Sequence, residues 1–123
     1  MPQRLRILIA EDDGVSLMVM GNALRDHDVT MAADGDEALK HITAGSFDLL
    51  ITDIMMPHTN GIGIIREARK THPHMKIIAV SSGSNMGPKD VLEWAKTAGA
   101  DDSLEKPFYD EQLREKVGQV MGL

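Results

Sequence analysis

The chain lacks cysteine altogether, and this absence excludes several kinds of site. Without cysteine there is no disulfide bond, no thiolate zinc site and no cysteine nucleophile. Long apolar runs are also missing, since none approaches the roughly 20 residues that a membrane-spanning helix needs. The apolar stretch at residues 7–10 is too short for the core of a signal peptide. We therefore expect a cytoplasmic protein with no membrane partner.

Basic residues are few and scattered. The chain has 13 Lys and Arg against 19 Asp and Glu, which gives a formal net charge of −6. Binding to the phosphates of nucleic acids needs clustered basic side chains, and this chain has no such cluster. We therefore expect no direct contact with nucleic acid.

The composition is that of one folded domain. The 123 residues are 42% hydrophobic and 26% charged, which is near the average for globular proteins and sufficient for a buried core. No linker, repeat or low-complexity tract divides the sequence. We predict a single domain over residues 1–123 with no output domain, although the chain could also be one piece of a longer protein.

Short apolar stretches alternate with amphipathic ones. This pattern predicts five strands, at residues 4–10, 28–32, 47–52, 75–80 and 101–104. It also predicts five helices, at residues 15–25, 34–44, 62–71, 88–98 and 109–121. Such alternation is typical of an α/β fold, in which a parallel sheet lies between two helical layers. His72 and His74, in the turn after the third helix, are expected to face solvent.

Polar side chains follow four of the predicted strands. In chain order they are Glu11, Asp12, Asp13, Asp53, Ser81 and Lys106. The carboxyl ends of parallel strands share one edge of the sheet, where ligands bind. Taken alone, each of these residues is most simply a helix cap, a loop hydroxyl or a surface lysine. Their placement at successive strand ends favours a shared site.

The residue types at this edge suit phosphoryl transfer. Neighbouring carboxylates repel one another unless a cation lies between them, and ligation by oxygen atoms with retained waters favours Mg²⁺ (or Mn²⁺). A divalent cation and a nearby lysine form a clamp for phosphoryl oxygens. A carboxylate can then act as the nucleophile and become an aspartyl phosphate.

Four segments resemble the motifs of one family. They are ILIAEDD at residues 7–13, DIMMP at 53–57 with Gly61, IIAVS at 77–81 and GADDSLEKPF at 99–108. In order and separation they resemble receiver domains of bacterial two-component response regulators, here of the stand-alone, CheY-like kind, over about residues 4–121. The resemblance implies a doubly wound, flavodoxin-like fold with five helices and the strand order 2-1-3-4-5.

The resemblance also implies roles for individual residues. Asp53 would be the phosphoacceptor, Ser81 would hydrogen-bond the phosphoryl group, and Lys106 would hold one of its oxygens. Asp12 would bind Mg²⁺ directly and Glu11 through water, with Asp53 and the backbone carbonyl of Met55 as further ligands. Pro107 would follow a cis peptide bond and aim the lysine, and Asp13 would cap the first helix.

One position departs from the family pattern. Receiver domains usually carry an aromatic residue or histidine three positions before the lysine, and this ring turns inward on activation. Here the position is Ser103. The signal would therefore have to pass through backbone and loop shifts near residues 81–86. Met55 and Gly83 occupy the positions that tune the lifetime of the phosphoryl group in this family. An apolar Met55 cannot position a hydrolytic water, so we predict slow self-dephosphorylation.

The implied function is a phosphorylation switch of a two-component phosphorelay. Asp53 would accept a phosphoryl group from a phosphohistidine of a sensor kinase or phosphotransfer protein, and the changed shape would control an unknown protein partner. Such a domain is not an enzyme in the usual sense, because it catalyses only its own phosphorylation and dephosphorylation. A receiver cut from a larger regulator and a pseudo-receiver with a dead site are the alternatives. A haloacid-dehalogenase-like phosphatase needs an aspartate where Met55 stands, so this function is disfavoured. Flavin binding is disfavoured as well, because it needs a phosphate-cradling loop after the first strand and the sequence has none there.

Overall fold

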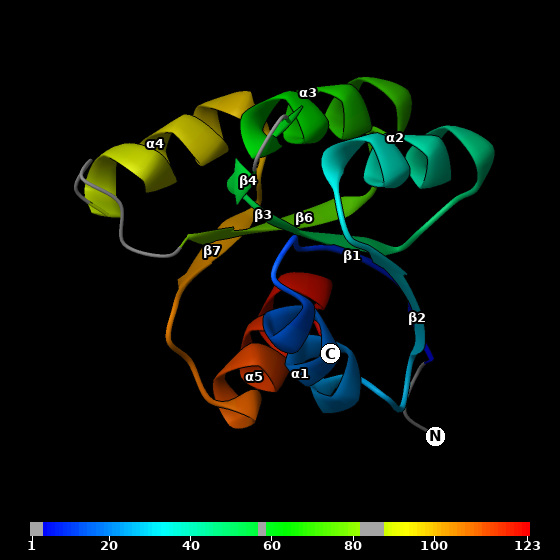
Figure 1. Cartoon of the computed structure of the whole chain (residues 1–123), viewed down its shortest axis with the longest axis vertical. Helices are drawn as coiled ribbons and strands as arrows, with labels where there is room; N and C mark the ends of the chain where they lie inside the picture. The colour runs from blue at the N-terminus through cyan, green and yellow to red at the C-terminus, as the bar shows by residue number, and fades with distance from the viewer. Residues whose placement is uncertain (1–3, 57–58, 82–87) are drawn as a thin grey trace.

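The computed structural model describes residues 4–56, 59–81 and 88–123 and places a parallel sheet between two helical layers (Figure 1). The strands of the sheet are β1 (Arg6–Ala10), β2 (Asp28–Ala32), β3 (Leu49–Asp53), β6 (Lys76–Ser81) and β7 (Asp102–Glu105). Their order is β2-β1-β3-β6-β7, and every neighbouring pair is parallel. This is the flavodoxin-like order 2-1-3-4-5, so the predicted fold is confirmed.

Five helices cover the two faces of the sheet within the described ranges. They are α1 (Gly14–Ala23), α2 (Gly35–Ala44), α3 (Gly61–Thr71), α4 (Pro88–Ala98) and α5 (Asp110–Met121). Figure 1 shows α2, α3 and α4 above the sheet and α1 and α5 below it. None of the helices in the described part of the chain has the length and apolar character required to cross a bilayer.

The core consists of two apolar clusters, one on each face of the sheet. Along β1, Leu8 packs into the cluster beneath α2, α3 and α4, whereas Ile7 and Ile9 pack into the cluster beneath α1 and α5. Strand β3 is fully buried and alternates in the same way. Burial on both faces explains why these strands have near-continuous apolar sequences. It also makes β1 and β3 a firm support for the residues at their carboxyl ends.

The helix starts follow from local capping. The Asp13 carboxylate accepts a hydrogen bond from the Val15 amide at 3.2 Å, so Asp13 caps α1 as expected. Asp34 caps α2 by accepting from the Glu37 amide at 2.8 Å. Capping places the start of α1 four residues beyond the last residue of β1, and therefore holds Glu11 and Asp12 at the sheet edge.

A short hairpin that the sequence did not predict follows β3. Strands β4 (Met55–Met56) and β5 (Thr59–Asn60) pair in an antiparallel manner, with Met55 opposite Asn60. The chain then enters α3 at Gly61. This hairpin brings the start of α3 close to the end of β3.

Arg69 ties the amino-terminal ends of β6 and β7 to the helices. Its guanidinium donates to the Gly99 carbonyl at 2.8 and 3.1 Å, to the Pro73 and Met75 carbonyls at 2.8 and 2.7 Å, and to the Asp101 carboxylate at 2.9 Å. The planar donor fork suits several acceptors at once. The network closes the end of the sheet opposite the carboxyl-terminal edge.

Candidate functional site

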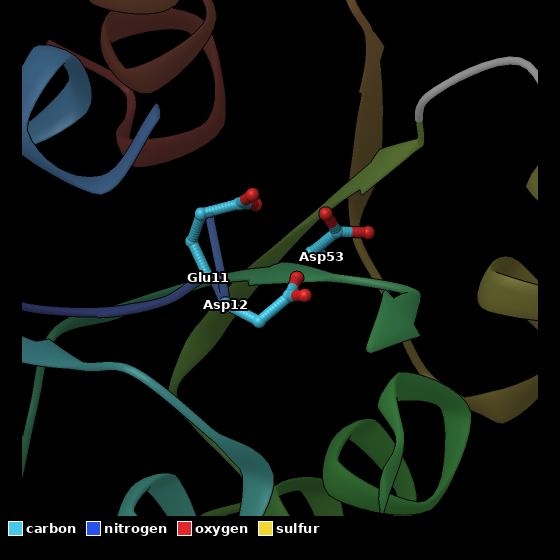
Figure 2. A group of neighbouring side chains, drawn as sticks. All are labelled: Glu11, Asp12 and Asp53. Atoms are coloured by element: carbon cyan, nitrogen blue, oxygen red, sulfur yellow. The ribbon is translucent and has the colours of Figure 1, made fainter. Parts of the chain in front are cut away.

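Strands β1 and β3 bring three carboxylates together at the carboxyl-terminal edge of the sheet. Glu11 and Asp12 directly follow β1, and Asp53 is the last residue of β3, which lies beside β1. One carboxylate oxygen of each residue lies within 4.8 Å of those of the other two. Figure 2 shows the three side chains extending from the two strand ends toward one another.

These carboxylates form an acidic pocket that could hold a metal ion. Glu11 and Asp53 are 1% and 3% exposed, whereas Asp12 is exposed and opens the pocket to solvent. The Glu11 Oε2 atom is buried and has no hydrogen-bond partner among the described residues. Buried carboxylate oxygens are normally paired, so this unpaired atom fits the role of a cation ligand. A few oxygen ligands on a partly open face leave room for the waters that Mg²⁺ retains.

Lys106 completes the pocket from the far side. It directly follows β7, and its backbone amide donates to the Ser81 carbonyl at 2.8 Å. The Lys106 Nζ atom lies 2.8 Å from Glu11 Oε1 and 3.3 Å from Asp53 Oδ2. One ammonium group therefore bridges acidic side chains that come from two different strands.

Burial and neighbouring charges shift the pKa values of two groups in the pocket. Burial and the neighbouring Asp53 together raise the pKa of Glu11 from 4.5 to about 7, with burial the larger cause, and Lys106 lowers it only in part. Burial lowers the pKa of Lys106, but its hydrogen bond to Glu11 and the charges of Asp53 and Glu11 outweigh this effect, so the pKa lies above its ordinary value. The lysine is therefore charged at neutral pH, while Glu11 is only partly ionised.

The Asp53 carboxylate has a fixed orientation. Its Oδ1 atom accepts a hydrogen bond from the Met55 amide at 2.9 Å, and Oδ2 faces Lys106. The Ile54 amide, which lies between Asp53 and Met55 in the chain, donates to the Val80 carbonyl at 3.0 Å. Each oxygen thus has one hydrogen-bonding partner and keeps a free lone pair, so the arrangement is compatible with a nucleophilic role for Asp53.

Ser81 is the last residue of β6 and follows Val80, which is the register partner of Asp53. Its hydroxyl is buried and has no hydrogen-bond partner among the described residues. A buried unpaired hydroxyl costs about 1–3 kcal/mol, so a group that accepts its hydrogen bond would bind favourably here.

The remaining predicted residues lie around this pocket or outside the described part. The peptide bond between Lys106 and Pro107 is cis, as the resemblance implies. Ser103 is half-buried in β7, in register with Ala79. Met55 is 52% exposed beside Asp53. Gly83 and the segment 82–86, to which we assigned lifetime tuning and signal passage, lie outside the described residues.

Two residues close to Asp53 were not recognised as important from the sequence. Thr52 is buried, and its hydroxyl donates to the Asp53 carbonyl at 3.1 Å. Gly61, noted only as part of a motif, lies against the backbone of Asp53 and Ile54. A hydroxyl inside the apolar run Leu49–Asp53 was the available signal for Thr52, whereas the close approach of Gly61 had none.

Comparison with known proteins identifies the family. Residues 7–118 match the family described as "Response regulator receiver domain". The chain is 32% identical over 126 residues to the 3',5'-cyclic-nucleotide phosphodiesterase regA of Dictyostelium discoideum, covering 98% of this chain and 16% of that protein. It is 36% identical over 118 residues to the transcriptional regulatory protein CpxR of Klebsiella pneumoniae, covering 94% of this chain and 49% of that protein.

Solved structures give the same result. A CheY-like response regulator receiver domain protein from Methanospirillum hungatei superposes with a TM-score of 0.89 at 30% identity, over 98% of this chain and 95% of that chain. The match therefore spans a small part of regA, half of CpxR and nearly the whole of the Methanospirillum hungatei protein. On its sequence, its fold and its acidic sheet edge, the chain belongs to the response regulator receiver domain family, which acts in two-component signalling.

Proposed function

We propose that this receiver domain is a phosphorylation switch that uses Mg²⁺ to accept a phosphoryl group onto Asp53. One observation carries the proposal. The carboxylates of Glu11, Asp12 and Asp53 meet within 4.8 Å, and the ammonium of Lys106 lies 2.8 and 3.3 Å from two of them. This combination supplies a nucleophile, cation ligands and a counter-charge for phosphoryl oxygens in one place.

The residues that would hold the metal are Glu11, Asp12, Asp53 and the backbone carbonyl of Met55. A bound Mg²⁺, or Mn²⁺ in its place, would offset the repulsion among the carboxylates and neutralise charge on the phosphoryl oxygens. With the repulsion relieved, Glu11 would lose its proton and its unpaired oxygen would gain a partner. Asp12 faces solvent, so it suits direct ligation, whereas the buried Glu11 is already held by Lys106.

The chemistry at Asp53 is a displacement at phosphorus. A carboxylate oxygen of Asp53 forms the new bond to phosphorus as the bond to the donor imidazole nitrogen breaks, and the imidazole keeps the electron pair of that bond. Lys106 exchanges its contact with Asp53 for one with a phosphoryl oxygen. The unpaired Ser81 hydroxyl donates to another phosphoryl oxygen. The donor leaves as a free imidazole, and water later removes the phosphoryl group from Asp53, so the domain catalyses only its own phosphorylation and dephosphorylation.

Receiver domains interact with kinases or phosphotransfer proteins and with downstream targets. For this chain we propose a phosphohistidine donor on a sensor kinase or a phosphotransfer protein. The surface next to the site supports a protein donor. Helix α1 contains no charged residue, and Val15 and Met18 are each 71% exposed. A cavity of about 210 Å³ lies between α1 and Pro107–Phe108, with Lys106 in its lining. A donor that covers Asp53 would therefore meet an apolar surface.

The test is self-phosphorylation from a small donor. The protein is incubated with acetyl phosphate and Mg²⁺, and its intact mass is followed with time. We expect the wild type to gain one phosphoryl group, Asp53→Asn to gain none, and the wild type in EDTA to gain none. No gain by the wild type at saturating donor and Mg²⁺ would overturn the proposal in favour of a pure interaction module. A gain by Asp53→Asn equal to that of the wild type would show a different acceptor.

A further inference from the structure

The peptide unit that follows Asp53 is held at each of its polar atoms. The Asp53 carbonyl accepts from the Thr52 hydroxyl at 3.1 Å, and the Ile54 amide donates to the Val80 carbonyl at 3.0 Å. The next carbonyl, that of Ile54, accepts from the Gly61 amide at 3.0 Å. Backbone groups bonded on all sides leave a peptide little freedom to tilt.

Gly61 fits this place because it lacks a side chain. A Cβ atom at position 61 would clash with the Asp53 carbonyl oxygen and would lie 2.6 Å from the Ile54 Cα atom. Both atoms belong to the backbone, so neither can yield by rotating a side chain. Any larger residue must push the Asp53–Ile54 peptide away from α3. The requirement is for close approach between two backbone segments.

Thr52 holds the same carbonyl with its hydroxyl. It is fully buried, and its register partners on β1 and β6 are Ala10 and Ala79. The alanine side chains at these two register positions carry no acceptor for the hydroxyl. The hydrogen bond to the Asp53 carbonyl therefore satisfies a donor that would otherwise be buried and unpaired.

The position of this peptide decides the geometry of the acidic pocket. The Met55 amide, one residue further on, donates to Asp53 Oδ1 at 2.9 Å and so orients the carboxylate. The peptide lies between the two partners of that hydrogen bond. A shift of the peptide therefore moves the carboxylate relative to Lys106 and to the other two acids.

We propose that Thr52 and Gly61 are positioning residues for the phosphoacceptor. They fix the Asp53–Ile54 peptide, and through it the Asp53 carboxylate, without touching the reacting atoms. The catalytic part of this inference rests on the proposed function, whereas the geometric part does not. A misplacement of about 1 Å in a reacting group costs on the order of 100-fold in rate, so small shifts are measurable.

Two pairs of variants test the inference. Thr52→Val keeps the shape of the side chain and removes the hydroxyl, whereas Thr52→Ser keeps the hydroxyl. Gly61→Ala adds the clashing Cβ, and Gly63→Ala adds the same atom at an exposed position of α3 where nothing lies within 4 Å. Hydrogen exchange at the Met55 amide reports the orientation of the carboxylate. The initial rate of phosphorylation from acetyl phosphate at saturating Mg²⁺ reports its reactivity.

In Thr52→Val and Gly61→Ala we expect the Met55 amide hydrogen to exchange about tenfold faster than in the wild type. We expect phosphorylation from acetyl phosphate to be about tenfold slower. Thr52→Ser and Gly63→Ala should stay within about twofold in both measurements. Unchanged exchange at Met55 in folded Thr52→Val would overturn the inference, whether or not Gly61→Ala folds. If the wild type takes up no phosphoryl group, the proposed function fails. The exchange data then still decide the positioning: faster exchange in both variants supports it, and unchanged exchange refutes it.

Discussion

Removing the charge of Glu11 should stabilise the metal-free protein at high pH and have no such effect at low pH. Glu11 is buried, and its pKa is raised from 4.5 to about 7, first by burial and then by Asp53. Below pH 4.5 both the folded and the unfolded chain carry the proton. Between pH 4.5 and 7 the unfolded chain loses it while the folded chain keeps it, so stability falls as the pH rises. Above pH 7 the full cost is present.

The size of the effect follows from the two pKa values. Their difference corresponds to about 3 kcal/mol in the free energy of unfolding once both states are ionised. Glu11→Gln mimics the protonated side chain, and its amide oxygen can still accept a hydrogen bond from Lys106. The substitution should therefore stabilise the protein by less than about 1 kcal/mol at pH 5 and by up to about 3 kcal/mol at pH 8.

Urea unfolding at pH 5 and pH 8 in EDTA measures this difference, because the wild type and the variant share all other titrating groups. The control is Glu93→Gln, at an exposed position of α4, which should shift stability by less than about 0.5 kcal/mol at either pH. With Mg²⁺ at pH 8 the wild type should be stabilised more than Glu11→Gln, because a cation held in the proposed site would interact with the ionised carboxylate. A stability difference that is the same at both pH values, or that favours the wild type at pH 8 in EDTA, would refute the reasoning.

Three further substitutions have defined outcomes. Met55→Asn or Met55→Glu should speed loss of the phosphoryl group several-fold in a decay assay, because a polar group beside Asp53 can hold the attacking water. Arg69→Ala should lower the free energy of unfolding by about 2–4 kcal/mol, because it leaves the Gly99 and Met75 carbonyls and the Asp101 carboxylate without this hydrogen-bond donor. Val15→Asp should slow transfer from a phosphohistidine protein about tenfold and leave the rate with acetyl phosphate unchanged.

Each of these has a contrary result. Slower decay in the Met55 variants would contradict the water-positioning account. A cost for Arg69→Ala no larger than that for Arg66→Ala, at an exposed position of the same helix, would show that the carbonyl network contributes little. Equal losses of rate with the protein donor and with acetyl phosphate would show that Val15→Asp damages the site and not a docking surface.

The sequence predicted the elements well because the central strands are buried on both faces. Their ends were less predictable. Phe47 extended the apolar run of β3, yet the strand begins at Leu49, because Leu49 is the residue that pairs with Ile7. The Phe47 side chain packs instead against the core below α2 and lies 5.8 Å from the Arg6 guanidinium. The ends of a strand depend on its partner, which a single sequence does not reveal.

The short hairpin and the burial of His72 also differ from the sequence-based expectation, because both depend on contacts with other segments. The hairpin β4–β5 has two residues on each side, too few for a periodic pattern. The expectation that His72 faces solvent was wrong, since it is half-buried and its Nε2 atom lies 2.7 Å from the Ile42 carbonyl. That contact joins the ends of α2 and α3, which are 30 residues apart along the chain. His74 is exposed, as expected.

Much of the candidate site could be predicted because topology alone brings strand ends together. Glu11, Asp53 and Lys106 meet since β1, β3 and β7 run in the same direction and end at one edge. The roles of Thr52 and Gly61 could not be predicted in this way. They depend on distances of a few ångströms between backbone segments, and residue type and spacing do not carry that information.

The lysine of the pocket is attached to the outermost strand of the sheet, whereas the acids are attached to its centre. Strand β7 has a single neighbour in the sheet, β6, and is further held by the Lys116–Asp102 ion pair at 3.2 Å and by the guanidinium network of Arg69. Edge elements open at a lower free-energy cost than central ones. Fraying of β7 would withdraw the ammonium group while the carboxylates stay assembled. On the proposed function, warming should therefore abolish phosphoryl uptake at a lower temperature than cation binding.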